Sequence, residues 1–199
     1  LYNEDTSSNS KEEVVKYCKM AAEKGNLNAM NDYANFLYTG KIVPINKELA
    51  FKYYKMAADK GHVMAINSCA NMLYFGHGIP INKEKAAKYY KINAENGESK
   101  AMGFYAFMLD HGEGVSVNKE EAIKYYKLAI DKGNVNAMYN YGLMFLNDRF
   151  QSNITEGIKY LKMAIDKGYV NAMNDYAYIL DIGYGVPVNK EESIKYYKM

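Results

Sequence analysis

Apolar residues recur along the chain with the spacing of an amphipathic helix. Residues 119–131 read KEEAIKYYKLAID, a segment that alternates between charged and apolar positions. Its apolar positions fall at i, i+3, i+4, i+7 and i+8: Ala122, Tyr125, Tyr126, Ala129 and Ile130. Because this spacing places them on one side of a helix, the segment is predicted to be helical with one buried face.

Copies of this segment are found throughout the chain, and each is followed by a glycine. These glycines are 36 residues apart three times and then 35 apart: Gly25, Gly61, Gly97, Gly133 and Gly168. A period between about 20 and 50 residues is typical of solenoids, in which each unit buries its apolar face against its neighbours. We therefore predict an all-α fold, a solenoid of about five helix-turn-helix repeats with period 36 plus a leading helix.

Each repeat is predicted to contain two helices, which we call A and B. The A helices are expected at residues 27–39, 63–75, 99–111, 135–147 and 170–182. The B helices are expected at 47–59, 83–95, 119–131, 154–166 and from 190 to the end of the chain, each started by an asparagine N-cap. One column of the A helices holds only small residues, which predicts a close approach of a neighbouring backbone: Ala34, Ala70, Ala106, Gly142 and Ala177.

The two ends of the chain differ from the repeats. Residues 1–10 are polar and lack an apolar period, so we expect a flexible leader that ends at Ser10, the N-cap of the first helix. Residues 11–199 are expected to form a single solenoid. Met199 lies inside the last B helix with no polar capping unit after it. We therefore expect further repeats beyond residue 199 or self-association through this uncapped end.

Charge and cysteine content narrow the possible partners. The 25 Lys and Arg nearly balance the 23 Asp and Glu, which argues against a nucleic-acid-binding protein. No apolar run approaches the ~18 residues needed to cross a bilayer, so membrane insertion is not expected. Cys18 and Cys69 occupy different columns of the repeat and are expected to be free thiols. This pattern favours a reducing compartment, and the cytoplasm is the default expectation.

Candidate catalytic chemistry is sparse. His62, His77 and His111 occupy different columns, so we expect surface histidines rather than a metal site. The loops after the A helices read G-x-G-[VI], but no strand precedes them and no G-x-G-x-x-G is completed. They are therefore predicted to be turns and not nucleotide sites. No serine or cysteine accompanies an evident base, and we predict no catalytic residue, metal or cofactor.

The repeat pattern is similar to that of a known family. It reads A-x-x-Y-Y-x-x-A-[AI]-x-x-G-x-x-x-A-M-x-x-Y-[AG]-x-x-L-x-x-G-x-G-[VI] and resembles the Sel-one-like repeat, with Tyr-Tyr in place of the usual Trp-Tyr. The resemblance covers residues 11–199. It implies a tetratricopeptide-like, right-handed α/α superhelix whose A helices line a concave groove, and a non-enzymatic adaptor or scaffold that binds other proteins.

Two functions other than an adaptor are compatible with a repeat of this kind. Some secreted relatives have a cysteine pair in each repeat, and a hydrolase activity has been proposed for them. This chain has only two cysteines in total, so the hydrolase alternative is less favoured. The other alternative is a structural spacer within a multi-protein complex. A spacer has no reason to gather aromatic residues on one face, as this chain is expected to do.

If the A helices line a groove, their residues outside the packing columns face a peptide or partner protein. The candidate groove residues are Asn28, Asn31, Asn35, Tyr38, Asn67, Asn71, Tyr74, Lys100, Phe107, Tyr139, Leu143 and Tyr178. The asparagines can donate to a peptide carbonyl and accept from its N–H at once, although solvated helix asparagines are the simpler alternative. The apolar and aromatic residues of the second half resemble the anchors of protein interfaces.

Overall fold

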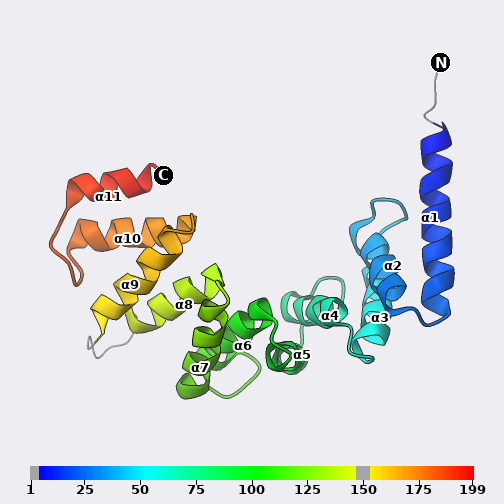
Figure 1. The fold of residues 1–199 in the computed structure, drawn as a ribbon, viewed down its shortest axis with the longest axis horizontal. Coiled ribbons are helices and arrows are strands. Elements are labelled where there is room, and N and C mark those ends of the chain that lie inside the picture. The colour runs from blue at the N-terminus through cyan, green and yellow to red at the C-terminus, as the bar shows by residue number, and fades with distance from the viewer. Residues whose placement is uncertain (1–4, 147–152) are drawn as a thin grey trace. The chain divides into compact units, whose positions relative to one another are not determined.

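The computed structural model describes residues 5–146 and 153–199, with the side chains described from residue 11 on, and every regular element in these residues is a helix (Figure 1). In chain order the helices are α1 (Asp5–Glu23), α2 (Leu27–Thr39), α3 (Lys47–Ala58), α4 (Val63–Phe75), α5 (Lys83–Glu95), α6 (Ser99–His111), α7 (Lys119–Asp131), α8 (Val135–Leu146), α9 (Ile154–Ile165), α10 (Val170–Ile182) and α11 (Lys190–Tyr197). The all-α fold predicted from the sequence is confirmed.

After α1, the A and B helices alternate as predicted, with α2, α4, α6, α8 and α10 as A helices. The predicted asparagine caps are present at four B helices: Asn46, Asn82, Asn118 and Asn189 each accept a hydrogen bond from a backbone N–H three residues on. Asn153, which precedes α9, makes no such bond. The loop that precedes it in the fourth repeat, residues 147–152, lies outside the described residues.

The start of α1 differs from the sequence expectation. The helix begins at Asp5, so Ser10 lies inside it and not at its N-cap. Extending an existing helix adds one backbone hydrogen bond for each residue fixed, and this requires no apolar side chain to pack. Polar residues can therefore belong to the helix without an apolar period. The expected flexible leader falls partly on residues 1–4, which lie outside the described residues.

The helices group into two compact units, each of which is considered by itself. One unit contains residues 1–96 with 113–115, and the other contains residues 97–112 with 116–199. Successive helices within each unit pack against one another. In both units the buried core combines fully buried alanines with tyrosines and methionines of the repeat columns, such as Ala57 and Met30 in the first and Ala172 and Tyr176 in the second.

The loops after the A helices confirm the predicted turns. Gly40, Gly76, Gly112 and Gly183 end their helices in the left-handed conformation. Gly114, the second glycine of one G-x-G, has a φ of +72°, and a Cβ there would lie 2.3 Å from the carbonyl carbon of Lys83. This position requires glycine both for the positive φ and for the close approach to the start of α5.

Helices α8 and α9 meet at two glycines. A Cβ on Gly142 would lie 3.0 Å from the carbonyl oxygen of Gly157, and a Cβ on Gly157 would lie 2.9 Å from that of Gly142. Real Cβ atoms scarcely approach a backbone oxygen this closely. The predicted close approach at the small-residue column is therefore confirmed for this helix pair.

Both cysteines are free, as predicted. Cys18 is half-buried, and its thiol lies 3.4 Å from the carbonyl oxygen of Ala29. Cys69 is fully buried in the core of the first unit. Burial, and to a smaller degree the charge of Asp59, raises the pKa of the Cys69 thiol from 9.0 to about 12.

This shift predicts a loss of stability at alkaline pH. The unfolded chain loses the Cys69 proton near pH 9.0 and the folded chain only near pH 12. The contribution is fully present below pH 9.0 and is lost as the pH rises toward 12, and at pH 10 the loss is about 1 kcal/mol. Denaturant unfolding between about pH 8 and pH 10 measures it. The variant Cys69→Ala should lose this contribution and no more, because buried tyrosines such as Tyr54, whose pKa is also raised, add their own pH dependence over the same range. Cys18→Ala should lose less, because the pKa of this half-buried thiol is also raised by burial but its side chain is less enclosed.

Candidate functional site

In the first unit, two predicted groove asparagines are held by buried tyrosines of the paired B helix. The hydroxyl of Tyr54 donates to Asn35 Oδ1, and that of Tyr90 donates to Asn71 Oδ1, both at 2.6 Å. Burial raises the pKa of Tyr54 to about 12 and that of Tyr90 further, so both hydroxyls remain proton donors. With its oxygen occupied, each amide has the two N–H groups of Nδ2 to offer.

Asn67 and Asn28 are also held through their oxygens. Asn93 of α5 is fully buried, and its Nδ2 donates to Asn67 Oδ1 at 2.8 Å. The Nδ1 atom of His62 accepts the cap hydrogen bond at the start of α4, so its Nε2 carries the proton. That Nε2 lies 3.0 Å from Asn28 Oδ1 and donates to it.

These four contacts change the chemistry expected of the asparagines. The sequence predicted that each amide donates to a ligand and accepts from it at once. Because the oxygens of Asn28, Asn35, Asn67 and Asn71 already accept from the protein, their amides are left mainly as donors. We call these four residues the asparagine row. Asn28 and Asn35 are exposed, and Asn67 and Asn71 are half-buried.

Asn31 does not join the row. It is only 6% exposed, and its Nδ2 donates to Asp32 Oδ1 at 3.3 Å, so the expectation that it faces a ligand was wrong. Asn31 lies at the border between the buried and the exposed side of α2. Helical periodicity alone does not tell whether a side chain at this border is buried or exposed. Lys100, in the second unit, is exposed as expected.

The two groove tyrosines of the first unit are bound to the loop of the next repeat. The hydroxyl of Tyr38 lies 2.9 Å from His77 Nδ1. The hydroxyl of Tyr74 donates to the carboxylate of Glu113, which Lys83 Nζ also approaches at 2.8 Å. Burial first, and then the bond to this carboxylate, raise the pKa of Tyr74. Both tyrosines therefore join neighbouring repeats and have little hydroxyl capacity left for a ligand.

In the second unit, two predicted residues line a cavity between α8 and α10. Leu143 and Tyr178 form part of the wall of this cavity, whose volume is about 320 Å³. The other lining residues are Leu146, Asp175, Ile179, Ile182 and Tyr184. We call it the α8–α10 cavity. It combines an apolar wall with a single carboxylate, the composition of many ligand sites.

Tyr139 and Phe107, the other aromatic residues predicted for this half, do not line the cavity. Tyr139 contacts a lining residue, because its hydroxyl donates to Asp175 Oδ2 at 2.8 Å. Burial and this bond raise the pKa of Tyr139. Phe107 stacks on His111 with ring centroids 4.2 Å apart. The structure thus brings together Leu143 and Tyr178 and places Tyr139 in support of the cavity.

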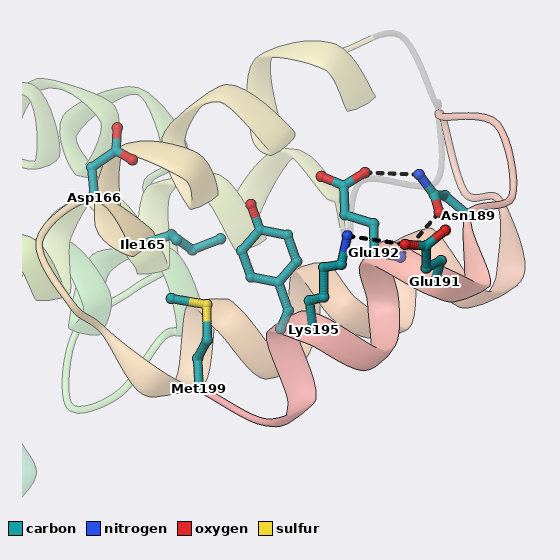
Figure 2. Close-up of a pocket in the computed structure, with 8 residues that line it drawn as sticks. Ile165, Asp166, Asn189, Glu191, Glu192, Lys195 and Met199 are labelled. Carbon is teal, nitrogen blue, oxygen red and sulfur yellow. Dashed lines mark hydrogen bonds and ion pairs between the residues drawn. The ribbon is translucent and has the colours of Figure 1, made fainter.

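A larger hollow of about 670 Å³ lies between the end of α9 and α11 (Figure 2). Four of its polar residues are paired among themselves. Asn189 Nδ2 donates to Glu192 Oε2 at 2.9 Å, and Lys195 Nζ lies 3.1 Å from Glu191 Oε1. These are a helix cap and a pair one turn apart on α11. These contacts lie within one helix and its cap, and none of the predicted groove residues lines this hollow.

The repeats of this chain match a family model along nearly their whole length. The Sel1 repeat model matches the chain at residues 15–26, 27–62, 63–98, 99–134, 135–169 and 170–199. The chain belongs to the Sel1 repeat family. Sel1 repeats generally mediate contacts between proteins, and proteins built from them are typically non-enzymatic scaffolds. The sequence matches none of the curated proteins with which it was compared.

Solved Sel1-type structures share the fold. The protective antigen c5321 of uropathogenic Escherichia coli, which displays an SLR fold, is 23% identical with a TM-score of 0.80, over 94% of this chain and 41% of that chain. A Sel1 repeat protein from Oxalobacter formigenes is 24% identical with a TM-score of 0.80, over 97% of this chain and 80% of that chain. The immunity protein Pa5087 from Pseudomonas aeruginosa is 19% identical with a TM-score of 0.58, over 94% of this chain and 72% of that chain. This chain thus spans about two fifths of c5321, and these identities support the fold alone.

Two further properties of this Sel1-repeat chain bear on partners. Among residues 5–146 and 153–199, no helix combines the length and apolar character needed to cross a bilayer. In the same residues, no three His, Cys, Asp or Glu side chains are grouped so that they could hold a metal ion.

The sequence did not reveal which residues hold the asparagine row and the wall of the α8–α10 cavity in position. Tyr54 and Tyr90 were assigned only to packing, although each lies 19 residues after the asparagine that it holds. That constant spacing was a usable signal. Asp175 was missed because it lies one position away from the residues of α10 that were expected to face the groove. The register of the repeats does not show it either, since Tyr139 and Asp175 are 36 residues apart and the period between these two repeats is 35.

Proposed function

We propose that this Sel1-repeat protein is a non-enzymatic scaffold that holds an extended segment of a partner protein on the asparagine row. The observation that carries the proposal is the pair of tyrosine hydroxyls bonded to Asn35 Oδ1 and Asn71 Oδ1. They fix two amides at equivalent positions of α2 and α4 through their oxygens, which leaves the Nδ2 groups as the donors. A peptide backbone in extended form offers the matching acceptors, its carbonyl oxygens.

The chemistry of the row favours backbone recognition over side-chain recognition. Amides are neutral, so they do not select a charged partner. A hydrogen bond of this kind contributes about 1 kcal/mol net, and several of them give a moderate affinity that depends little on the sequence of the partner. Such binding suits an adaptor. Cytoplasmic residence is part of the same proposal, since the cysteine pattern does not match a secreted disulfide scaffold.

The competing functions lack comparable support. A spacer needs stacking alone and does not require that four amide oxygens be fixed. A hydrolase needs a nucleophile beside a base. Cys69 is fully buried and its thiol pKa is raised to about 12, the opposite of an activated thiol.

Exchange of the row asparagines for aspartate tests the proposal. In the variant Asn35→Asp with Asn71→Asp, each carboxylate still accepts from its tyrosine but no longer donates to a carbonyl. Loss of two hydrogen bonds and repulsion of the carbonyl oxygens should weaken peptide binding by at least about 30-fold. The measurement is fluorescence anisotropy with peptides that contain no lysine or arginine, selected from a random displayed library by the unaltered chain.

The matched control is Asn96→Ala, which changes an exposed asparagine at the end of α5. It should leave the affinity unchanged, and circular dichroism should show the same helix content in all variants. If the double aspartate variant binds the selected peptides as tightly as the unaltered chain, the asparagine row is not the binding surface.

A further inference from the structure

The α8–α10 cavity in the second unit carries an inference of its own, because its wall is apolar except for one charged group. Leu143, Ile179 and Ile182 provide aliphatic surface, and Tyr178 is 58% exposed at its edge. Among the lining residues that the structure describes, Asp175 is the only ionisable side chain apart from the tyrosines. At about 320 Å³ the cavity lies at the lower end of the range for small-molecule sites, a size that suits one or two side chains of a peptide.

Asp175 is held as an acceptor. The hydroxyl of Tyr139 donates to its Oδ2 at 2.8 Å and fixes the carboxylate at the wall. An ionised carboxylate has room for about four hydrogen bonds, so this single bond leaves most of its capacity open. The aspartate is half-buried, which strengthens its attraction for a cation relative to a fully solvated carboxylate.

Three lysines of α9 and α11 contact groups other than Asp175. Lys159 of α9 lies 3.1 Å from Glu156, and Lys190 at the start of α11 lies 2.8 Å from Asp181. Lys162 lies over the ring of Tyr176, 5.0 Å from its centroid. Each of these three cations has a partner other than Asp175.

We propose that the α8–α10 cavity binds a peptide segment of a partner in which a large apolar side chain stands beside a lysine or arginine. The apolar side chain enters between Leu143 and Tyr178 and loses its contact with water. The adjacent cation pairs with Asp175 at the wall, where charge complementarity decides between basic and acidic neighbours. This inference concerns a surface separate from the asparagine row and does not depend on it.

Selection of peptides by charge-swapped variants tests the proposal. Random dodecapeptides displayed on phage are selected by the full chain and, in parallel, by the variants Asp175→Asn and Asp175→Lys. The full chain should enrich an aromatic or large aliphatic residue with Lys or Arg within two positions. Asp175→Asn keeps an acceptor for Tyr139 and should lose the basic preference, and Asp175→Lys should reverse it toward Asp and Glu.

Affinity measurements with the most enriched peptide give the magnitude. Asp175→Asn should raise the Kd at least about tenfold, since a charge-assisted contact is lost. Tyr178→Ala should raise it by a similar factor through loss of apolar contact. Asp131→Asn changes an exposed aspartate of α7 that does not line the cavity and should leave the Kd within about twofold.

The outcomes separate this inference from the proposed function. The double variant Asn35→Asp with Asn71→Asp should retain the enrichment of apolar–basic peptides even if it loses backbone binding. The same enriched motif for the full chain and for Asp175→Lys overturns the proposal. So does a selection that enriches no motif with a basic residue beside an apolar one.

Discussion

Replacing Gly157 with alanine is expected to lower the free energy of unfolding by about 2 kcal/mol, in the range found for overpacking of a tight core. Three other B helices carry alanine at this position: Ala50, Ala86 and Ala122. In the fourth repeat, however, the new Cβ would lie 2.9 Å from the carbonyl oxygen of Gly142 and 2.9 Å from Leu146 Cγ. A backbone carbonyl cannot rotate away, so α8 and α9 would have to separate and lose contact along their length.

Gly103→Ala is the matched control for that substitution. Gly103 also lies inside a helix of the second unit, but a Cβ there would meet nothing closer than 3.6 Å. Alanine should therefore stabilise this helix by up to about 1 kcal/mol through its higher helix propensity. Denaturant unfolding followed by circular dichroism compares the two variants. Equal changes for Gly103→Ala and Gly157→Ala would show that the glycine contact of α8 with α9 is not tight.

Removing one tyrosine hydroxyl is expected to have opposite effects in neighbouring repeats. Tyr90→Phe removes the donor to Asn71 and should cost about 1 kcal/mol. Tyr126→Phe should leave stability unchanged or raise it by about 1 kcal/mol, because the Tyr126 hydroxyl is buried without a hydrogen-bond partner. Burial raises the pKa of Tyr126, so no ionised form relieves this cost near neutral pH. The residue 19 positions before Tyr126 is Phe107, where the first two repeats have asparagine.

A double-mutant cycle with Phe107→Asn isolates the cause. The new asparagine restores the arrangement found at Asn35 and Asn71 and gives the Tyr126 hydroxyl an acceptor. In the Phe107→Asn background, Tyr126→Phe should then become destabilising, with a coupling of about 1 kcal/mol between the two positions. Equal effects of Tyr126→Phe in both backgrounds would mean that the hydroxyl gains nothing from the asparagine.

The positions of the helices in this protein could be predicted from its sequence with few errors. The glycine period, the asparagine caps and the apolar spacing all indicate the same boundaries, and α2 to α11 begin and end within two residues of them. The largest difference is at α11, which ends at Tyr197, so that Met199 lies outside it. The small-residue column was predictable for the same reason, because a position that is Ala or Gly in every repeat indicates a steric limit. The start of α1 was missed because polar residues can extend a helix without leaving a periodic trace.

The polar contacts of the candidate site were much less predictable. The spacing of residues along a helix shows which of them share a face, but it does not show which partner holds each side chain. The occupied oxygen of Asn35, the burial of Asn31 and the position of Asp175 at the cavity wall depend on the tilt of neighbouring helices. Small differences in the position of a neighbouring helix decide whether an amide donates or accepts. Helical periodicity cannot resolve such differences.

The unpartnered hydroxyl of Tyr126 marks the place where the repeats stop being interchangeable. The first two repeats have both the asparagine and the tyrosine, the third has Phe107 with Tyr126, and the fourth has Leu143 with Leu161. A buried hydroxyl without an acceptor costs free energy that an apolar side chain of the same shape does not. An A helix of the first two repeats grafted into the third would therefore bring its own acceptor for Tyr126, whereas the A helix of the fourth would not.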